Sequence, residues 1–526
     1  MYMTLFKNPL FMLGCLTMII TISCTKNKET IPDEYFDPVG SLYDDNLKPF
    51  YHGVASGDPL PDRVIIWTRV TPEKVETSIP VQWELAEDPN FSFIYKSDTL
   101  RASSQHDYTV KVDVDGLQPD HTYYYRFSAL GKKSITGRTK TTPIELKEEL
   151  QFAVVSCSNW EWGYFNAYSK IADHENLDAV LHLGDYIYEH GVGQYGDTTI
   201  GRFNLPAHEI VTLQDYRTRY SQYKTDVGSR RAHQQHPFIT VWDDHEIANN
   251  SYKEGAQNHQ LDEGDYEARK NAARQAYYEW LPIRESKILY RSISFGPLVD
   301  LIMLDERLAG RTKQLDSLSD PMYNSEERSM LGEDQLQWFE QELSKSKAVW
   351  KLVGNQVIFS DIDLSQVLPR MPRNLDSWDG YPAEKQLIKN VIVDKRIRDV
   401  VFVTGDTHAS WAIEVATHVS TTYDPMTSKG AFAVEFGTPS ISAANSNERT
   451  PTEKVKESEV ILMNSNPHLK YVNNRDHGYI ILTLTPTHVK SEWYYVETLR
   501  KEGGGAHKGK TMVVKKGTTS IIASED

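Results

Sequence analysis

The chain has 526 residues, of which 39% are hydrophobic and 25% charged, an ordinary globular composition with enough length for two or three domains. Its formal net charge of -16 argues against long nucleic acid as a partner, because binding a phosphate backbone relies on dense Lys and Arg. The same charge leaves nucleotides and small phosphate esters open as ligands, since bound cations would lower the effective charge of a site.

The N-terminus has the pattern of an export signal. A lysine precedes an apolar run over residues 9–22, which is shorter than the ~20 residues of a membrane span but suits a signal peptide. The Thr-Ile-Ser-Cys sequence at residues 21–24 resembles a bacterial lipobox, although Leu is usual in place of the Thr. The resemblance implies that residues 1–23 are a lipoprotein signal peptide and that Cys24 is lipidated as the mature N-terminus. A plain secretory signal cut nearby is the alternative, and the lack of a twin-Arg pair favours Sec export.

The expected location follows from this anchor. Residues 24–48 are polar and are predicted to form a tether between the lipid and the folded body. We therefore expect an exported protein, lipid-anchored in the periplasm or on the outer membrane of a bacterium, whose contact with the membrane is made through its lipid.

The cysteines mark a possible ligand. The chain has three, Cys15, Cys24 and Cys157. Cys15 lies in the signal, so Cys157 is the one thiol of the exported body and has no disulfide partner. A lone thiol in an oxidising compartment is either a small buried hydrophobe or a metal ligand. Its place at the end of a strand, beside other metal-binding residue types, favours the thiolate ligand.

Residues 49–143 are predicted to be an all-β domain. Residues 108–114 alternate polar and apolar, as a half-buried strand does. Residues 116–127 are similar to the fibronectin type III pattern, in which a Leu-x-Pro turn precedes a Tyr-rich strand and a tyrosine hydroxyl bonds back to the corner backbone. We predict an immunoglobulin/fibronectin III-like β-sandwich with a structural role, and a linker over residues 139–149.

Residues 150–500 are predicted to be the catalytic domain, so the chain as a whole is of the α+β multi-domain class. Strands alternate with amphipathic helical stretches, among them residues 266–280 and 334–343, which predicts a layered α/β core. Residues 501–526, with three consecutive glycines near their start, are expected to be a C-terminal extension.

Four motifs follow apolar runs typical of buried strands. They are Ser156-Cys157, Gly184-Asp185-Tyr186-Ile187-Tyr188-Glu189, Asp243-Asp244-His245-Glu246 and Gly405-Asp406-Thr407-His408. In open α/β sheets, ligands bind beyond the carboxyl ends of the strands. We therefore expect four strands to bring these side chains to one edge of a sheet. The mixture of oxygen, nitrogen and sulfur donors indicates a metal site with more than one ion.

The second and third motifs carry the strongest indications. Asp185 has two carboxylate oxygens and can bridge two cations, and Tyr188 can add a phenolate if a ferric ion lowers its pKa. The adjacent Asp243 and Asp244 repel each other unless a cation or an Arg lies nearby. His245 is a candidate proton donor to a phosphate oxygen or a leaving group.

Further ligands follow the third motif and lie in the fourth. Asn249 and Asn250 each offer a neutral carbonyl ligand, and the spacing does not decide which of Asp244, Asn249 and Asn250 reaches a metal. Asp406 and His408 are alternate residues, which share one side of an extended segment.

The set of motifs resembles the PhoD-like alkaline phosphatase/phosphodiesterase family, which belongs to the calcineurin-like metallophosphoesterases and is related to the purple acid phosphatases. His-Gly-Val-Ala-Ser-Gly-Asp-Pro at residues 52–59 and Trp-Asp-Gly-Tyr-Pro at residues 378–382 also match. The resemblance implies a four-layer α/β/β/α core holding Fe3+ and Ca2+, with Zn2+ or Mn2+ less favoured.

The resemblance also implies a distribution of ligands. Cys157, Asp185 and Tyr188 would bind iron, whereas Asp185, Asp406 and an Asp or Asn of the third block would bind calcium, with His408 beside them. One departure is Leu304-Asp305-Glu306-Arg307, where Leu-Asp-Thr-Arg is usual. Arg307 is retained and is a candidate phosphate partner or structural residue.

The function expected from this reading is hydrolysis of small phosphate mono- or diesters by a metal-activated hydroxide, with His245, Asp244 and Arg307 as catalytic residues. Asp376, Trp378 and Tyr381 are expected to shape the pocket or pack. Two alternatives are a surface binding lipoprotein on a catalytically inactive fold of this class, and a nucleotide diesterase on the same site. The first is disfavoured because every motif keeps its ligand-type residues. Neither the preferred ester nor the oligomeric state follows from the motifs.

Overall fold

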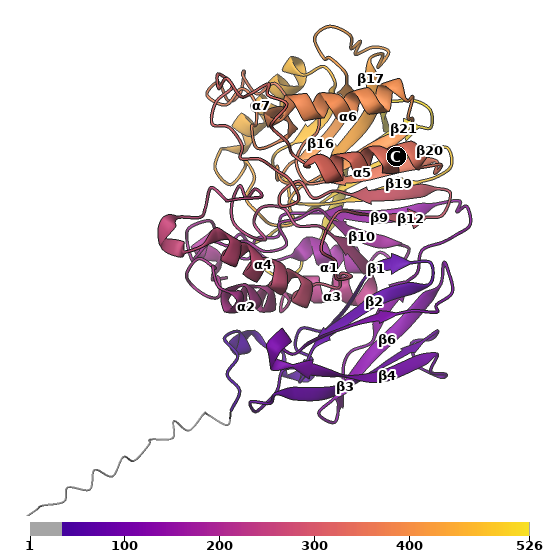
Figure 1. Ribbon diagram of the computed structural model, residues 1–526, viewed down its shortest axis with the longest axis vertical. Helices are drawn as coiled ribbons and strands as arrows, with labels where there is room; N and C mark the ends of the chain where they lie inside the picture. Colours follow the sequence, from indigo (N-terminus) through magenta and orange to yellow (C-terminus); the bar gives the residue numbers. More distant parts are fainter. Residues whose placement is uncertain (1–33, 525–526) are drawn as a thin grey trace, which may run out of the picture.

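The computed structural model describes residues 34–524 (Figure 1). The expected signal peptide and Cys24 lie outside the described residues. Over the described part of the chain, no helix is both long enough and apolar enough to cross a membrane.

The largest element is a ten-stranded mixed sheet. Its middle strands β9, β10, β11 and β1 are parallel to one another, and its outer strands pair antiparallel. In spatial order the strands are β22 (Ile521–Ser524), β21 (Ala506–Lys515), β20 (His488–Val496), β19 (Gly478–Leu484), β9 (Leu150–Val155), β10 (Ala179–His182), β11 (Pro237–Thr240), β1 (Val54–Leu60), β2 (Arg63–Arg69) and β5 (Thr109–Val114).

A second sheet of seven strands stacks on the first. Its strands β13, β14, β15 and β17 are parallel, and β12, β16 and β18 are antiparallel to their neighbours. The spatial order is β12 (Arg291–Phe295), β13 (Val299–Met303), β14 (Trp350–Asn355), β15 (Val400–Thr404), β17 (Ala431–Gly437), β16 (Ser410–Ala416) and β18 (Leu469–Asn473).

The alternation of side chains along each strand explains the stacking. On β15, Val401 and Val403 join the core shared with the ten-stranded sheet, whereas Val400 and Phe402 face the opposite side. Both faces of this strand are apolar, so both must be covered by another layer. The ten-stranded sheet packs against one face of the seven-stranded sheet, and helices pack against the other face.

The helices cover the outer faces of both sheets (Figure 1). Four pack into the core on the side of the ten-stranded sheet: α1 (Asn166–Ala172), α2 (Leu213–Tyr223), α3 (Val227–Gln235) and α4 (Tyr266–Trp280). Two pack against the seven-stranded sheet, α5 (Glu333–Lys345) and α6 (Pro382–Asp394), while α7 (Thr452–Ser465) lies against β18. The helix expected over residues 266–280 has the expected bounds, because Asp265 caps its first turn by accepting a hydrogen bond from the Ala268 N–H at 2.8 Å.

A third sheet completes the N-terminal region. It contains β4 (Lys96–Ser103), β3 (Ser78–Ala86), β6 (Thr122–Ala129) and β7 (Lys132–Lys133), with β8 (Gly137–Lys140) paired to β6. It packs against β1, β2 and β5 through a cluster that includes Ile66, Val81 and Tyr125. The Tyr123 hydroxyl accepts a hydrogen bond at 3.0 Å from the Gln118 N–H, the corner contact expected from the sequence.

One sheet of this N-terminal region continues into the expected catalytic domain. Sequence patterns did not reveal this continuity. Strand β1 pairs in parallel with β11, aligning Gly57 with Phe238. The approach is close, because a Cβ on Gly57 would lie 2.2 Å from the Pro282 carbonyl oxygen. The expected domain boundary near residue 143 is therefore a loop in the sequence but not a break in the structure, because the ten-stranded sheet contains strands from both sides of it.

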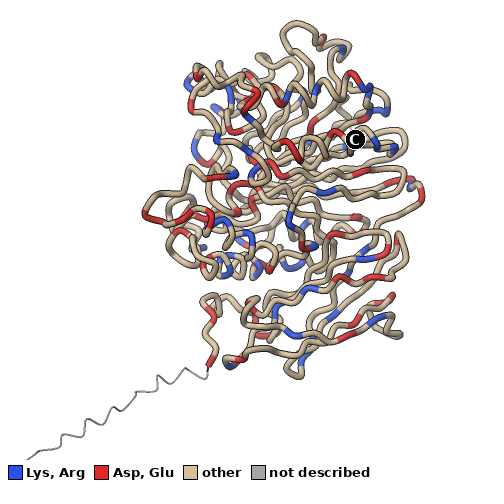
Figure 2. Tube along the Cα trace, in the orientation of Figure 1, with Lys and Arg blue, Asp and Glu red and all other residues tan. Residues whose placement is uncertain are grey.

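Two expected terminal segments differ in the structure. The described end of the expected tether is packed, because Asp37 pairs with the buried Arg69 at 2.8 Å and the Tyr43 ring stacks on Tyr51. The expected C-terminal extension instead forms β21 and β22, whose Met512 and Val514 alternate into the core. Figure 2 shows Lys and Arg interspersed with Asp and Glu along the described trace, so charge along the trace does not by itself mark a site.

Candidate metal centre

The four motifs meet where two sheets come together, and not at the edge of one sheet as expected. The first three follow β9, β10 and β11 of the ten-stranded sheet, and the fourth follows β15 of the seven-stranded sheet. The loops touch closely, since a Cβ on Gly405 would lie 2.9 Å from the Ser156 Cβ. The expectation failed because strand patterns do not say which sheet a strand joins, although the convergence itself was predictable.

The backbone at the predicted ligands is unusual. Left-handed φ values, which side chains other than Gly rarely adopt, occur at five of them: Cys157 (61°), Asp185 (56°), Asn250 (53°), Asp406 (61°) and His408 (57°). Such strain costs about 1–3 kcal/mol per residue and clusters at functional sites. All five strained residues lie in the loops that follow the strands and not in the strands themselves.

Buried hydrogen bonds hold these turns. The Glu246 carboxylate accepts from the backbone N–H groups of Asp185 at 2.9 Å, Asp243 at 2.8 Å and Tyr186 at 2.5 Å. The second and third motifs are therefore fastened to each other through one side chain. This role of Glu246 could not be assigned from the sequence, because motif spacing does not distinguish an anchoring carboxylate from a metal ligand.

One part of the site gathers a thiol, a carboxylate and an imidazole. Ligand atoms of Cys157, Asp185 and His408 lie within 4.8 Å of one another. The Tyr188 hydroxyl donates to Asp185 Oδ2 at 3.0 Å and lies 3.2 Å from His408 Nε2. Burial, together with the charge of Asp185, raises the pKa of both the Cys157 thiol and the Tyr188 phenol. A cation among these groups would favour their ionised forms.

The adjoining part is a cluster of carboxylates. Ligand atoms of Asp243, Asp244 and Asp406 lie within 4.8 Å of one another, as do those of Asp185, Asp244 and His245. Burial raises the pKa of Asp243 to about 8 and that of Asp406 to about 7, against the lowering effect of Arg307. These carboxylates are destabilised by their burial and their proximity, which is the environment that a hard cation relieves.

Asp243, which the sequence placed in the third motif without a role separate from that of Asp244, is a ligand candidate in its own right. Its Oδ1 accepts from Arg307 Nε at 2.5 Å, whereas its Oδ2 is buried without a hydrogen-bond partner. An unsatisfied buried polar atom costs about 1–3 kcal/mol, and more when it is charged. This free oxygen beside Asp244 and Asp406 fits a cation ligand.

The two asparagines belong to the same loop. The Asn250 N–H donates to Asp244 Oδ2 at 2.6 Å. Both side-chain amides donate to Gln257 Oε1, at 3.0 Å from Asn249 and 2.7 Å from Asn250. Because the NH2 groups are used by Gln257, the amide oxygens are the groups left to bind a cation.

His245 is held by a carboxylate from the second motif. Its Nδ1 lies 2.6 Å from Glu189 Oε2, and Glu189 also accepts from the Asn249 N–H at 2.7 Å. Burial lowers the pKa of His245, but Glu189 and the carboxylates of Asp244 and Asp185 outweigh burial and raise it well above its usual range. These carboxylates favour the imidazolium form, and Glu189, to which the sequence assigned no role, fixes the orientation of the ring.

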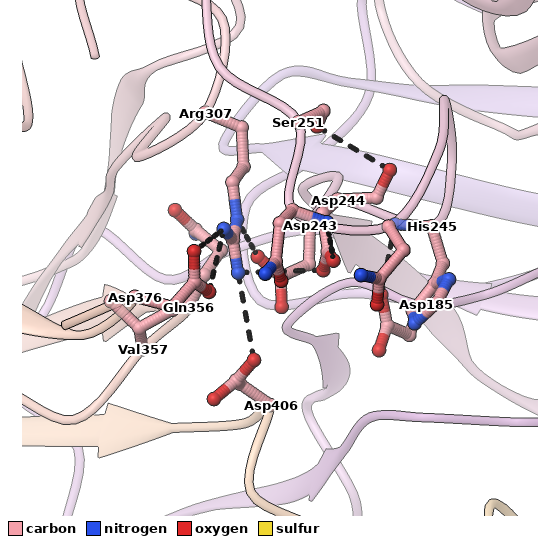
Figure 3. Close-up of polar contacts among 12 residues, drawn as sticks. Asp185, Asp243, Asp244, His245, Ser251, Arg307, Gln356, Val357, Asp376 and Asp406 are labelled. Carbon is pink, nitrogen blue, oxygen red and sulfur yellow. Dashed lines mark hydrogen bonds and ion pairs between the residues drawn. The ribbon is translucent and has the colours of Figure 1, made fainter. Parts of the chain in front are cut away.

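Arg307 does not have the catalytic or phosphate-binding environment expected for it. Its side chain is 0% exposed and pairs with Asp243 at 2.5 Å and Asp376 at 2.9 Å, with Asp244 and Asp406 at 3.4 and 3.5 Å (Figure 3). All its N–H groups face these carboxylates, so it positions them and neutralises part of their charge. Asp376 also pairs with Arg311 at 2.5 Å.

The unusual Glu306 is an anchor as well. Its buried carboxylate accepts from the N–H groups of Gln356 at 2.8 Å and Val357 at 2.9 Å and from Trp378 Nε1 at 2.8 Å. It thereby ties the loop after β14 to the loop that carries Arg307. Trp378 and Tyr381 are buried packing residues, as expected.

The residues fit metal ions on three observations of this chain. Thiol, phenol, imidazole and carboxylate donors converge, the carboxylates outnumber the arginines that face them, and one carboxylate oxygen has no partner. Bound cations would neutralise the charge of a phosphoryl group and lower the pKa of a bound water.

Comparisons with known proteins agree with this arrangement. The model of the PhoD-like phosphatase family matches residues 152–493, and that of the PhoD-like phosphatase N-terminal domain matches residues 42–143. The chain belongs to the PhoD-like phosphatase family. It is 35% identical over 494 residues to alkaline phosphatase D of Bacillus subtilis (strain 168), covering 90% of this chain and 82% of that protein.

A solved structure described as the structure of PhoD superposes with a TM-score of 0.81 at 33% identity, covering 91% of this chain and 93% of that chain. The expected family is therefore confirmed, and with it a phosphoric ester hydrolase of mixed α and β structure.

Proposed function

We propose that this member of the PhoD-like phosphatase family is a metal-dependent phosphoesterase that hydrolyses small phosphate mono- or diesters at the junction of the two sheets. The observation that carries the proposal is the excess of buried carboxylates around Arg307, with Asp243 Oδ2 left without a partner beside a buried thiol and phenol. A protein without bound cations gains nothing from this arrangement, since its groups are destabilised by burial and repulsion.

The proposed ligand set divides between two kinds of cation. Fe3+ suits the thiolate of Cys157 and the phenolate of Tyr188, and Ca2+ suits carboxylate and amide oxygens. Asp185 belongs to both groups, as its contacts with both parts of the site suggest. The proposed oxygen ligands of Ca2+ are Asp243, Asp244, Asp406 and an amide oxygen of Asn249 or Asn250, with His408 next to them.

The proposed role of His245 is proton donation to the leaving group. The imidazolium form is favoured by Glu189, which also fixes the orientation of the ring by holding Nδ1. The opposite ring nitrogen, Nε2, is then free to donate a proton to an ester oxygen. No serine or other covalent nucleophile is required.

The test combines elemental analysis with a panel of phosphate mono- and diesters. We expect iron and calcium in the purified protein and turnover of at least one ester class. His245→Gln is expected to slow esters with poor leaving groups by about 10²–10⁴-fold and those with good leaving groups much less. A fully folded protein that contains only zinc would refute the cation assignment, and a metal-loaded protein that hydrolyses no ester would refute the proposed activity.

Export with a lipid on Cys24 is part of the proposal. We expect Cys24→Ala to release the protein from the membrane fraction or to leave the precursor uncleaved, because two or more acyl chains give stable anchoring where one would not. An unmodified mature protein that is free in the periplasm would contradict this anchor. We also propose that the N-terminal region is an immunoglobulin/fibronectin III-like sandwich and that the rest of the fold is a four-layer metallophosphoesterase core.

A further inference from the structure

A cavity of about 490 Å³ opens beside the metal centre. Asn250 and Asp376 are among its lining residues, so it borders both a proposed ligand and the partner of Arg307. Most of the remaining lining comes from two loops, residues 313–318 and residues 370–375. We call this cavity the side pocket, and its volume lies in the range that holds small organic ligands.

Some charged side chains that line the side pocket form ion pairs with other residues of the protein, and others do not. Asp376 is paired with Arg307 and Arg311, and Arg373 is paired with Asp379 at 3.3 Å. Lys313 and Arg370 are exposed, and within residues 34–524 neither makes an ion pair. Asp316 is the one carboxylate of the lining that is likewise without an ion-pair partner in the described chain. The groups left to meet a ligand are therefore two cations and one anion.

The remaining lining mixes amide and hydroxyl groups with an aliphatic part. Leu315, Leu318 and Leu375 contribute to the walls, and Met371 is 45% exposed at the pocket. An exposed methionine beside leucines provides an adaptable apolar surface. The side pocket therefore combines a positive charge balance with apolar contact area.

We propose that the side pocket receives the organic group of the phosphate ester, and that Arg370 and Lys313 select groups that carry a second negative charge next to an apolar part. The inference rests on the proposed phosphoesterase function. Arg307 is committed to carboxylates, so recognition of a second anionic group falls to cations farther from the reacting phosphorus. An Arg at this place can bind a carboxylate or a phosphate with two parallel hydrogen bonds.

The test uses two esters of matched size, 4-carboxyphenyl phosphate and 4-carbamoylphenyl phosphate, with released phosphate as the readout. The two differ by one charge at the far end of the leaving group. We expect the protein to have a lower KM for the carboxylate ester at similar kcat, because a contact equal in ground and transition states changes KM alone. Arg370→Gln should reduce the preference by about tenfold while leaving the amide ester unaffected.

Two further variants separate a local contact from a general charge effect. Asp316→Asn should increase the carboxylate preference, since it removes the opposing charge of the lining. Arg398→Gln removes an exposed cation that precedes β15, at the end of that strand opposite the site, and should leave the preference unchanged.

The possible results distinguish failure of the proposed selectivity of the side pocket from failure of the proposed phosphoesterase activity. Equal KM values for the two esters, or a preference that survives Arg370→Gln, would overturn the role of the side pocket while leaving the phosphoesterase intact. If neither ester nor phenyl phosphate is hydrolysed by metal-loaded protein, the proposed function fails and this inference falls with it.

Discussion

Two buried arginines show how the N-terminal region differs from the catalytic body. Arg69 is 2% exposed and pairs with Asp37 at 2.8 Å and Asp107 at 2.9 Å. Arg307 is 0% exposed and faces Asp243, Asp376, Asp244 and Asp406. The first network also receives hydroxyl contacts from Tyr35 and Thr71. It is a closed set in which the arginine is balanced by its neighbours.

The second network, around Arg307, is open in the sense that its carboxylates are not all paired with a donor. No buried side-chain oxygen of Asp37 or Asp107 lacks a hydrogen-bond partner, whereas Asp243 Oδ2 does. An arginine surrounded by a matched set of acceptors stabilises a fold, but one that faces surplus carboxylates leaves charge to be neutralised by something else. The comparison therefore distinguishes a structural ion network from a cation site without reference to sequence motifs.

The largest expected effect comes from removing the shared carboxylate of the open network. Asp185→Asn is expected to abolish turnover, because a carboxylate that contacts both parts of the site holds both cations. Loss of several kcal/mol of transition-state stabilisation corresponds to about 10³-fold or more in rate. Metal content and turnover measured on the same folded sample test this.

The matched variant in the closed network is Asp107→Asn. We expect it to lower the stability of the N-terminal region by about 3 kcal/mol while metal content and turnover per folded molecule remain normal. Near-normal turnover in Asp185→Asn, or metal loss in Asp107→Asn, would contradict the distinction between the two networks.

Replacing each arginine by methionine tests the charge balance itself. Removal of one partner from a buried ion network costs about 3–5 kcal/mol, so both variants should unfold at lower denaturant concentration. Arg307→Met leaves additional uncompensated carboxylates at the proposed calcium ligands, so added calcium should restore part of its stability by binding the folded state. Arg69→Met should not respond. Urea-unfolding midpoints with and without calcium provide the measurement, and an equal response of the two variants would refute the idea.

Cys157→Ser is expected to fold, to lose most of its iron and to be about 10²-fold less active, because serine ionises far less readily than a thiol. A visible charge-transfer band from a ferric phenolate at Tyr188 should disappear with the iron. If Cys157 is only a buried hydrophobe packed with Tyr188 and Ala443, the variant will keep its metals and lose modest stability. Iron content and thermal midpoint measured together separate these outcomes.

The sequence was sufficient for the local features of this site. The proposed ligands follow strand ends with recognisable motifs, and the helix at residues 266–280 is bounded by its own cap at Asp265. These features depend on residues close together in the chain, where periodicity and turn chemistry act directly. The identity of the family followed from the same motifs.

The features that could not be predicted depend on distant pairing. Strand β1 joins β11 about 180 residues later, at a contact made possible by Gly57, and no local pattern encodes the partner of a strand. The anchoring roles of Glu246 and Glu306 could not be predicted either, because they depend on contacts with residues that are distant in the sequence. A buried glutamate that accepts backbone N–H bonds looks the same in sequence as a ligand or an exposed acid.

The terminal segments add a second reason. On strand β21, the buried Met512 and Val514 alternate with Val513 and the exposed Lys515, but three glycines precede the strand and suggested a flexible extension. Residues 34–48 were expected to belong to a polar tether, yet Val39 is buried, and Asp37 and Tyr43 belong to the Arg69 network. A polar side chain is exposed to solvent only when the fold offers it no buried partner. Such a partner is known only once the fold is known.

The smallest expected effect concerns the corner of the N-terminal region, where one hydroxyl can be removed without disturbing charge. Tyr123→Phe deletes the acceptor of the Gln118 N–H but keeps the buried ring, so the loss should be about 1 kcal/mol. Tyr124 is the control, because it is the next residue on β6, points to the opposite face and has no hydrogen bond recorded for its hydroxyl in the described chain. Tyr124→Phe should leave the urea-unfolding midpoint unchanged, and both variants should keep full turnover. If Tyr123→Phe instead reduced metal content, the corner would be coupled to the centre through the sheet that crosses from β1 to β11, and the N-terminal region would no longer be purely structural.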